Sequence, residues 1–142
     1  MYLFDTNIVS ELRRTKPHGA VLNWVAGVPD EQIYLSAVSL GEIQKGIEAL
    51  RPRDAQKAES LEAWADLLTA QANILPMTGA IFRLWAKLMH GKSDTAYEDA
   101  MLAATAITHR LTLVTRNIKD FQAFGIALLN PFEPIAGKRK LP

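Results

Sequence analysis

The stretch MYLFDTNIVSEL, residues 1–12, indicates the fold, because a short apolar strand passes directly into a helix. Tyr2-Leu3-Phe4 has the character of a buried strand, which we place at residues 1–5. Asp5 stands where this strand ends, and a helix follows in TNIVSELRR. A carboxylate at such a position is ordinarily the N-cap of the helix. The rest of the sequence decides whether Asp5 has a second role.

Short apolar runs alternate with helical patterns along the whole chain. Further strands are expected at residues 32–36, 73–77, 111–115 and 127–129, and LTLVT at 111–115 is the clearest of them. Strands separated by helices indicate a parallel sheet with helices on both faces. We therefore expect a protein of the α/β class.

The expected helices follow from capping residues and from apolar residues at helical spacing. They are residues 6–14, a helix opened by Pro17 and ended near Gly27, a helix capped by Ser36 or Ser39, residues 53–72, a helix capped by Thr78, residues 96–110, and residues 118–123. The helix at 96–110 is apolar almost all round from Ala100 onward, so we expect it to be buried.

The composition is that of an ordinary globular protein. The chain has 142 residues, of which 49% are hydrophobic and 22% are charged, and this suits one domain with one core. We expect that domain to span residues 1–135 and to be followed by a basic, mobile tail at residues 136–142. The net charge of +1 neither requires nor excludes a nucleic-acid partner.

Residue types that are missing from the sequence narrow its possible chemistry. The sequence contains no cysteine, which excludes disulfides, thiolate catalysis and zinc held by cysteine. It has neither the basic-then-apolar start of a signal peptide nor a run of about 20 apolar residues that could span a bilayer. We expect a cytoplasmic protein without a membrane partner.

Acidic and polar residues fall close to the ends of the expected strands. Asp5 ends the first strand, Glu42 lies on the first turns of the helix after the second, and Asp99 opens the buried helix. Asn117 and Asp120 follow LTLVT. In an open parallel sheet the working site lies beyond the carboxyl ends of the strands, where the strand order reverses. These residues are therefore candidates for one common site.

Gathering several carboxylates at one edge of the sheet would require a cation. Two carboxylates about 5 Å apart repel each other by roughly 3 kcal/mol at an effective dielectric constant of about 20. No lysine or arginine stands at an obvious pairing position within these stretches, and an all-oxygen site favours Mg²⁺ or Mn²⁺. Taken singly, each acid has an ordinary alternative role as a helix cap, a first-turn carboxylate or a loop residue. The spacing alone leaves both interpretations open.

Other sequence signals are weaker. Lys45 follows Glu42 by three residues and Arg116 stands beside Asn117, so either cation would suit a phosphate backbone, although such residues are usually just solvated. No GxGxxG or GxxxxGK[ST] motif occurs, which argues against dinucleotide and P-loop sites. Ser36 and Ser39 have no histidine nearby in the pattern, so a hydrolase triad is unsupported.

Four stretches together resemble the PIN-domain ribonucleases, specifically the toxin component of VapBC-type toxin–antitoxin modules. They are LFDTNIVSEL, YLSAVSLGEIQKGIEAL, EDAMLAATAITHRLTLVTRNIKDF and LLNPFEP, spread over residues 2–134. The resemblance implies a three-layer α/β/α domain around a central parallel sheet that cuts single-stranded RNA with Mg²⁺ or Mn²⁺. It also implies a homodimer and a small antitoxin partner that binds DNA.

The resemblance also assigns roles to individual residues. Asp5, Glu42 and Asp99 match the acids of the family's catalytic site, and we expect Asp5 and Asp99 to hold the metal. Matching polar positions support them, namely Thr6, Asn7 and Thr115. Where many members have an acid in a T-x-D pattern, this chain has Asn117, and either Asn117 or Asp120 would complete the site. Arg116 and Lys45 would bind the substrate.

Two rival functions remain open at this stage. A phosphoryl-transfer protein of the receiver or haloacid-dehalogenase kind also has an aspartate after its first strand. Such proteins carry a second acid next to that aspartate or two residues later, and Thr6 and Asn7 occupy those places here. A non-catalytic binding module with the same fold would act only through a protein partner.

Overall fold

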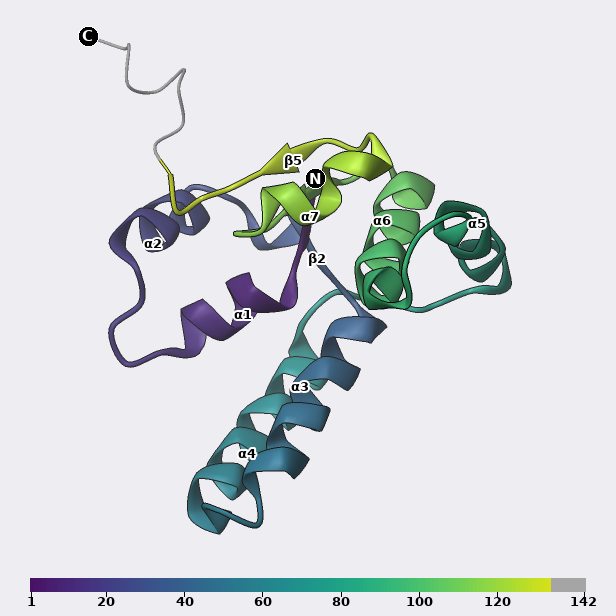
Figure 1. Cartoon of the computed structure of the whole chain (residues 1–142). Helices are drawn as coiled ribbons and strands as arrows, with labels where there is room; N and C mark the ends of the chain where they lie inside the picture. The colour runs from purple at the N-terminus through teal and green to yellow at the C-terminus, as the bar shows by residue number, and fades with distance from the viewer. Residues whose placement is uncertain (134–142) are drawn as a thin grey trace, which may run out of the picture.

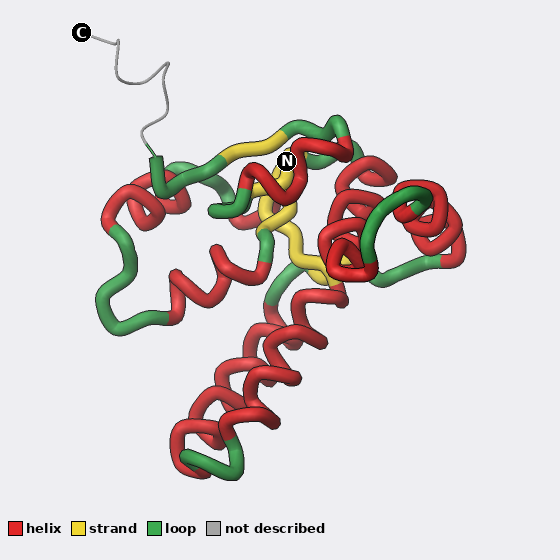
Figure 2. The backbone as a smooth tube through the Cα atoms, viewed as in Figure 1, coloured by secondary structure: helices red, strands yellow, loops and turns green. Residues whose placement is uncertain are grey.

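A computed structural model of the chain describes residues 1–133, and the expected basic tail lies outside the described residues. Within this part the strands form one sheet in the order β3-β2-β1-β4-β5. Figure 1 labels the helices around this sheet, and Figure 2 shows the strands in yellow among them. All neighbouring strands run parallel, which confirms the expected α/β architecture with a central parallel sheet. The strands are β1 (Tyr2–Phe4), β2 (Ile33–Ser36), β3 (Ile74–Leu75), β4 (Thr112–Val114) and β5 (Leu128–Leu129).

Helices connect the strands in the expected order. They are α1 (Thr6–Arg13), α2 (Gly19–Ala26), α3 (Ala37–Leu50), α4 (Ala55–Gln71), α5 (Gly79–Met89), α6 (Tyr97–His109) and α7 (Ile118–Phe121). Three short 3₁₀ helices were not expected, namely η1 (Asp30–Gln32), η2 (Asp94–Ala96) and η3 (Gln122–Phe124). The strands are also shorter than the apolar runs suggested.

The prediction that Pro17 opens the second helix is wrong. The helix α2 begins at Gly19, and His18 is its N-cap, with the imidazole nitrogen Nδ1 accepting a hydrogen bond from the backbone N–H of Ala20. Elsewhere the expected caps are confirmed. Ser36 caps α3, and Thr78 caps α5.

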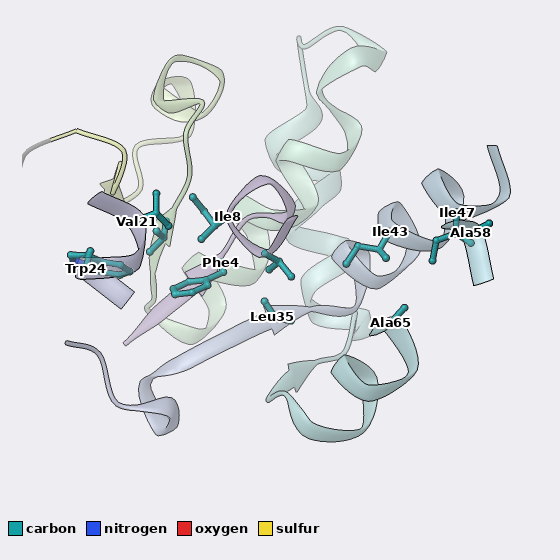
Figure 3. Packing of buried hydrophobic residues seen from close by; sticks show 11 residues of the cluster. Phe4, Ile8, Val21, Trp24, Leu35, Ile43, Ile47, Ala58 and Ala65 are labelled. Atoms are coloured by element: carbon teal, nitrogen blue, oxygen red, sulfur yellow. The ribbon is translucent and has the colours of Figure 1, made fainter. Parts of the chain in front are cut away.

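Successive residues of a strand pack into two different apolar cores, one on each face of the sheet. Phe4, Leu35 and Val114 belong to the core shared with α1, α2, α3 and α4 (Figure 3). Leu3 and Leu113 point to the opposite face and pack against α6, α7 and η3. Because successive residues of a strand point to opposite faces, a sheet covered on both sides needs continuously apolar strands. This explains the runs seen in the sequence.

The helices divide into two layers with a projecting hairpin. Figure 1 shows α1 and α2 on one side of the strands and α5 and α6 on the other. The α3–α4 hairpin extends away from the sheet, so its tip at residues 51–54 lies far from the strands. No helix within residues 1–133 is long and apolar enough to cross a bilayer.

The strand order places β1 and β4 side by side at the centre of the sheet. β1 pairs with β2 on one side and with β4 on the other, with Phe4 opposite Val114. The first connection therefore leads outward to one side, and the later strands are added on the other side. Such a reversal leaves a crevice at the carboxyl ends of the two central strands. Asp5 and Thr115 are the first residues beyond those ends.

Candidate active site

Asp5 uses its two carboxylate oxygens for different purposes. Oδ1 accepts a hydrogen bond from the backbone N–H of Thr6 at 2.7 Å, which is the expected N-cap of α1. Oδ2 accepts the hydroxyl of Thr115 at 2.8 Å and the side-chain amide of Asn7 at 3.3 Å. The Asp5 side chain is therefore fixed to the ends of both central strands, and the residue is only 8% exposed.

The segment after β4 is tied to the same point. Thr115 is fully buried, and its hydroxyl oxygen accepts the backbone N–H of Asn117 at 3.0 Å. The amide oxygen of Asn7 accepts the backbone N–H of Arg116 at 3.3 Å. These polar contacts hold the turn after β4 against Asp5 and fix where its side chains project.

Glu42 approaches from α3. Its Oε1 accepts the Thr6 hydroxyl at 2.8 Å, and that hydroxyl also lies 3.0 Å from the Ser39 hydroxyl. Ser36 begins α3 directly after β2, so the first turns of this helix lie at the carboxyl edge of the sheet. The half-buried Glu42 carboxyl is thus linked through Thr6 to the start of α1.

The first turn of α6 supplies two further acids, Glu98 and Asp99. Asp99 is half-buried and Glu98 is exposed. The negative charges of Asp5, Asp120 and Glu98 all raise the pKa of Asp99, in that order after the effect of burial. We call Asp5, Glu42, Glu98, Asp99 and Asp120 the acidic cluster.

Burial and the charges of neighbouring carboxylates raise the pKa values of Asp5, Glu42 and Asp99. The pKa of Glu42 rises from 4.5 to about 7, mainly because of burial and then because of the Glu98 carboxyl. The pKa of Asp99 rises from 3.8 to about 6, again mainly through burial. Burial also raises the pKa of Asp5, against the opposing effect of its hydrogen bonds from Thr115 and Thr6. Each of these shifts disfavours the ionised form.

No basic side chain compensates this charge within residues 1–133. The ion pairs of this part join Arg14 to Glu11 and Arg51 to Glu48 and Glu62, all outside the acidic cluster. Uncompensated oxygen donors are the set that a hard divalent cation such as Mg²⁺ or Mn²⁺ prefers. No three acidic or histidine side chains of the described residues come close enough to enclose an ion. The donors therefore fit an ion held by one or two carboxylates and otherwise by water, which is usual for Mg²⁺.

The structure brings most of the expected site residues together. The hydrogen-bonded network described above joins Asp5, Thr6, Asn7, Glu42 and Thr115. The charge of Asp120 raises the pKa of Asp5, and the charges of Asp5 and Asp120 raise the pKa of Asp99.

The other expected site residues take a smaller part in this network. They are Asn117 and the two expected substrate-binding residues, Lys45 and Arg116. Asn117 enters the network through its backbone N–H, and no hydrogen bond of its side chain is seen within residues 1–133. Lys45 is exposed and forms no ion pair with a described carboxylate, whereas Arg116 is held beside Asp5 through Asn7.

Glu98 is the member of the acidic cluster that sequence reasoning did not select. Its effect on the pKa of Glu42 and of Asp99 places it within electrostatic reach of both. Its position directly before Asp99 in a first helical turn was the available signal. That signal was weak, because acids in a first turn are commonly there to interact with the helix dipole.

Comparison with known proteins shows similarity over almost the whole chain. The family model described as PIN domain matches residues 2–126. The VapC ribonuclease Y4jK of Sinorhizobium fredii is 32% identical over 94% of this chain and 99% of the relative. Toxin FitB of Neisseria gonorrhoeae is 34% identical over 93% of this chain and 99% of the relative.

A solved structure extends the similarity to three dimensions. A chain in a toxin–antitoxin complex from Klebsiella pneumoniae superposes with a TM-score of 0.71 at 27% identity. The match covers 94% of this chain and 100% of that one. The range of the family model, residues 2–126, includes both central strands and all members of the acidic cluster.

Proposed function

The chain belongs to the PIN domain family, as one of its VapC-type ribonuclease toxins, and we propose that it hydrolyses RNA with a divalent metal ion at the acidic cluster. The observation that carries this proposal is the convergence of carboxylates on one edge of the sheet without a basic partner among residues 1–133. A cluster of this kind without a chemical role would be costly, because burial and neighbouring negative charges raise the pKa values of Asp5, Glu42 and Asp99. Perturbed acids gathered in a crevice are typical of a catalytic site.

Asp5 and Asp99 are the residues that would hold Mg²⁺ or Mn²⁺, with Asp120 as the fourth acid in place of Asn117. When bound, the ion lowers the pKa of water and stabilises negative charge on the phosphoryl oxygens. Thr115, Asn7 and the Thr6 N–H keep the Asp5 carboxylate in one orientation. A fixed orientation avoids the cost of reorganising the site during the reaction.

Glu42 would act as the general base. The Thr6 hydroxyl donates to Oε1 of Glu42, and the Glu98 carboxyl lies within hydrogen-bonding reach of the same side chain. The Glu42 carboxylate would take a proton from the attacking water. General bases work best with a pKa near the pH of the reaction. The elevated pKa of Glu42, about 7, meets that requirement.

The proposal extends to partners. The toxin–antitoxin complex that this chain resembles supports an antitoxin that would neutralise it. An apolar groove of about 390 Å³ between α1, α2 and α4 includes Val25, Trp64 and Leu68, and it would accept an inserted segment of such a partner. We also propose a homodimer acting on RNA in the cytoplasm.

The first experiment compares cleavage of mixed RNAs by the wild type and by Asp5→Asn. Asparagine keeps the acceptor for the Thr6 N–H and the shape of the side chain, so the variant should fold, but it removes the charge. We expect wild-type cleavage with Mg²⁺ or Mn²⁺, none with EDTA, and a loss of at least about 100-fold in the variant. Asp66→Asn, on the exposed face of α4, is the matched control and should cleave like the wild type.

Two outcomes would overturn the proposal. Full activity of a folded Asp5→Asn protein would exclude the acidic cluster as the catalytic site. Absence of cleavage by the folded wild type, purified free of antitoxin and supplied with either metal, would favour the non-catalytic binding module instead.

A further inference from the structure

A hollow lined mostly by polar residues lies directly beside the acidic cluster, and Asp120 is the one residue of its lining used in the proposed chemistry. The hollow measures about 470 Å³, within the range of about 300–1,000 Å³ that is usual for small-molecule sites. The segment after β4, α7 and the segment after β5 line it. We call it the Arg116 hollow, and its polar lining includes Arg116, Asn117, Lys119, Asp120, Gln122 and Asn130. Asp120 belongs to both the hollow and the acidic cluster.

Arg116 is held in a defined position between the two sites. Its backbone N–H donates to the Asn7 amide oxygen at 3.3 Å, and its carbonyl accepts the Asn130 amide at 3.4 Å. Its guanidinium carbon lies 4.4 Å from the centre of the Phe132 ring. The Arg116 side chain is nevertheless exposed within the described part of the chain. Guanidinium planes stack on the unpaired bases of single-stranded RNA.

Amide groups in the hollow are suited to reading a base. Both polar atoms of the Asn130 side-chain amide already form hydrogen bonds. Its nitrogen donates to the Arg116 carbonyl, and its oxygen accepts the Phe132 N–H at 2.9 Å. The side-chain amides of Gln122 and Asn117 form no hydrogen bond within residues 1–133, and each offers a donor and an acceptor. Paired donors and acceptors match the edges of nucleobases.

The charge of the hollow favours a neutral guest over a phosphate. Arg116 and Lys119 contribute positive charges, and Asp120 and Glu133 contribute an equal negative charge. A phosphate-binding site would instead show an excess of positive charge. A nucleobase is polar, flat and uncharged, and it therefore fits this lining better.

We propose that the Arg116 hollow binds the base of a nucleotide next to the scissile phosphate of single-stranded RNA. Arg116 stacks on the base, and the Gln122 amide reads its edge. The hollow adjoins the acidic cluster at Asp120, so a strand with its phosphate at the cluster has a neighbouring base within reach. This inference rests on the proposed ribonuclease function and adds a source of sequence preference.

The test is to map cleavage sites in a random pool of single-stranded RNAs. Wild type should show a preference at one position beside the cut. Gln122→Ala should reduce that preference at least about fivefold, because a good amide–base pair discriminates by about 1–3 kcal/mol. Arg116→Lys keeps the charge but loses the stacking plane, and it should raise KM about tenfold while changing kcat less.

Matched controls come from the tip of the α3–α4 hairpin. Gln56→Ala and Arg53→Lys change the same residue types at exposed positions far from the sheet, and both should match the wild type in preference and in KM. If Gln122→Ala and Arg116→Lys behave like these controls, the hollow is not a base-binding site, although the ribonuclease proposal would stand.

A binding assay separates failure of the inference from failure of the function. Affinity for a fluorescent single-stranded oligonucleotide is measured in EDTA with Asp5→Asn protein, with and without Arg116→Ala. A loss of about tenfold with Arg116→Ala supports the hollow even if the wild type cleaves none of the RNAs. Unchanged affinity, or no binding by either protein, overturns the inference.

Discussion

Asp5 combines a structural role and a proposed chemical role because its two oxygens face different groups. Oδ1 caps α1, and Oδ2 joins β1 to β4 through Thr115. Loss of an N-cap alone costs about 1 kcal/mol. An asparagine retains that cap but places an amide NH₂ where Oδ2 accepts the Thr115 hydroxyl and the Asn7 amide, so Asp5→Asn also weakens the link between β1 and β4. The cleavage comparison therefore needs the free energy of unfolding of both proteins beside it.

Glu42→Gln should separate catalysis from stability. Glutamine still accepts the Thr6 hydroxyl but can neither take a proton nor repel Glu98. We expect RNA cleavage to fall about 10²–10⁴-fold, as for loss of a general base. In EDTA at pH 8 the free energy of unfolding of the variant should be about 1 kcal/mol higher than that of the wild type, so the variant is more stable. This figure allows for the half-exposed position of the carboxyl. Denaturant unfolding measures this, and a less stable variant would contradict the repulsion inferred here.

The raised pKa values predict how the metal-free protein responds to pH. Glu42, at about 7, and Asp99, at about 6, bind protons more readily when folded than when unfolded. Stability therefore falls as pH rises through the window from about 4 to 7 and is affected little by these groups above it. Melting temperatures in EDTA should be higher at pH 5.5 than at pH 7.5. Glu42→Gln should reduce this difference, and a rise in melting temperature with pH would exclude the shifts.

The sequence was sufficient for the acids of the site that follow strands or open helices. Asp5, Glu42 and Asp99 could be placed at one edge because parallel strands bring their carboxyl ends together. Glu98 could not, because the direction of a side chain in a first helical turn depends on how the helix packs. The substrate contact expected of Lys45 stays a prediction, because an exposed position on α3 is compatible with it.

At the scale of elements, the end of α6 contains a strained residue. Arg110 caps this helix in the left-handed conformation with φ 56°, which glycine adopts without penalty. Arg110→Gly should therefore stabilise the protein by roughly 1 kcal/mol. A melting temperature higher by a few degrees is the expected readout.

The reverse substitution at Gly125, glycine to alanine, is the control for that change. Gly125 ends η3 with φ 67°, and an added Cβ would meet no atom within 4 Å. Gly125→Ala should then lower stability through the backbone alone. If Arg110→Gly and Gly125→Ala shift the melting temperature in the same direction, left-handed strain is not the cause.

Element types were predictable from the pattern, but element ends were less so. Continuous apolar runs marked each strand because both faces of the sheet are covered. The runs overestimated strand length, since flanking residues such as the buried Leu111 and the exposed Met1 are apolar like strand residues but lie outside the strands. Pro17 was a misleading start signal, because His18 caps α2 through a ring nitrogen, which the usual capping preferences do not include.

At the scale of the whole molecule, the acidic cluster should link metal binding to folding. The unfolded chain has no preformed site, so a bound ion stabilises only the folded state. Saturation at about 100 times Kd should add about 2.7 kcal/mol to the free energy of unfolding. Mg²⁺ should therefore raise the melting temperature of the wild type at pH 7.5 and raise that of Asp5→Asn less. Equal shifts in both proteins would indicate weak binding elsewhere on the surface.

The pairing of β1 with β4 has a consequence for the order of events during synthesis. The hydroxyl that holds Asp5 lies 110 positions later in the chain. At about 5–20 residues per second, the ribosome takes roughly 5–20 s to make that interval. During that time the new chain carries its first acid but not the strand that orients it. If Asp5 acts as proposed, we expect a nascent chain that has not yet made β4, and a product that stops before it, to be inactive as ribonucleases.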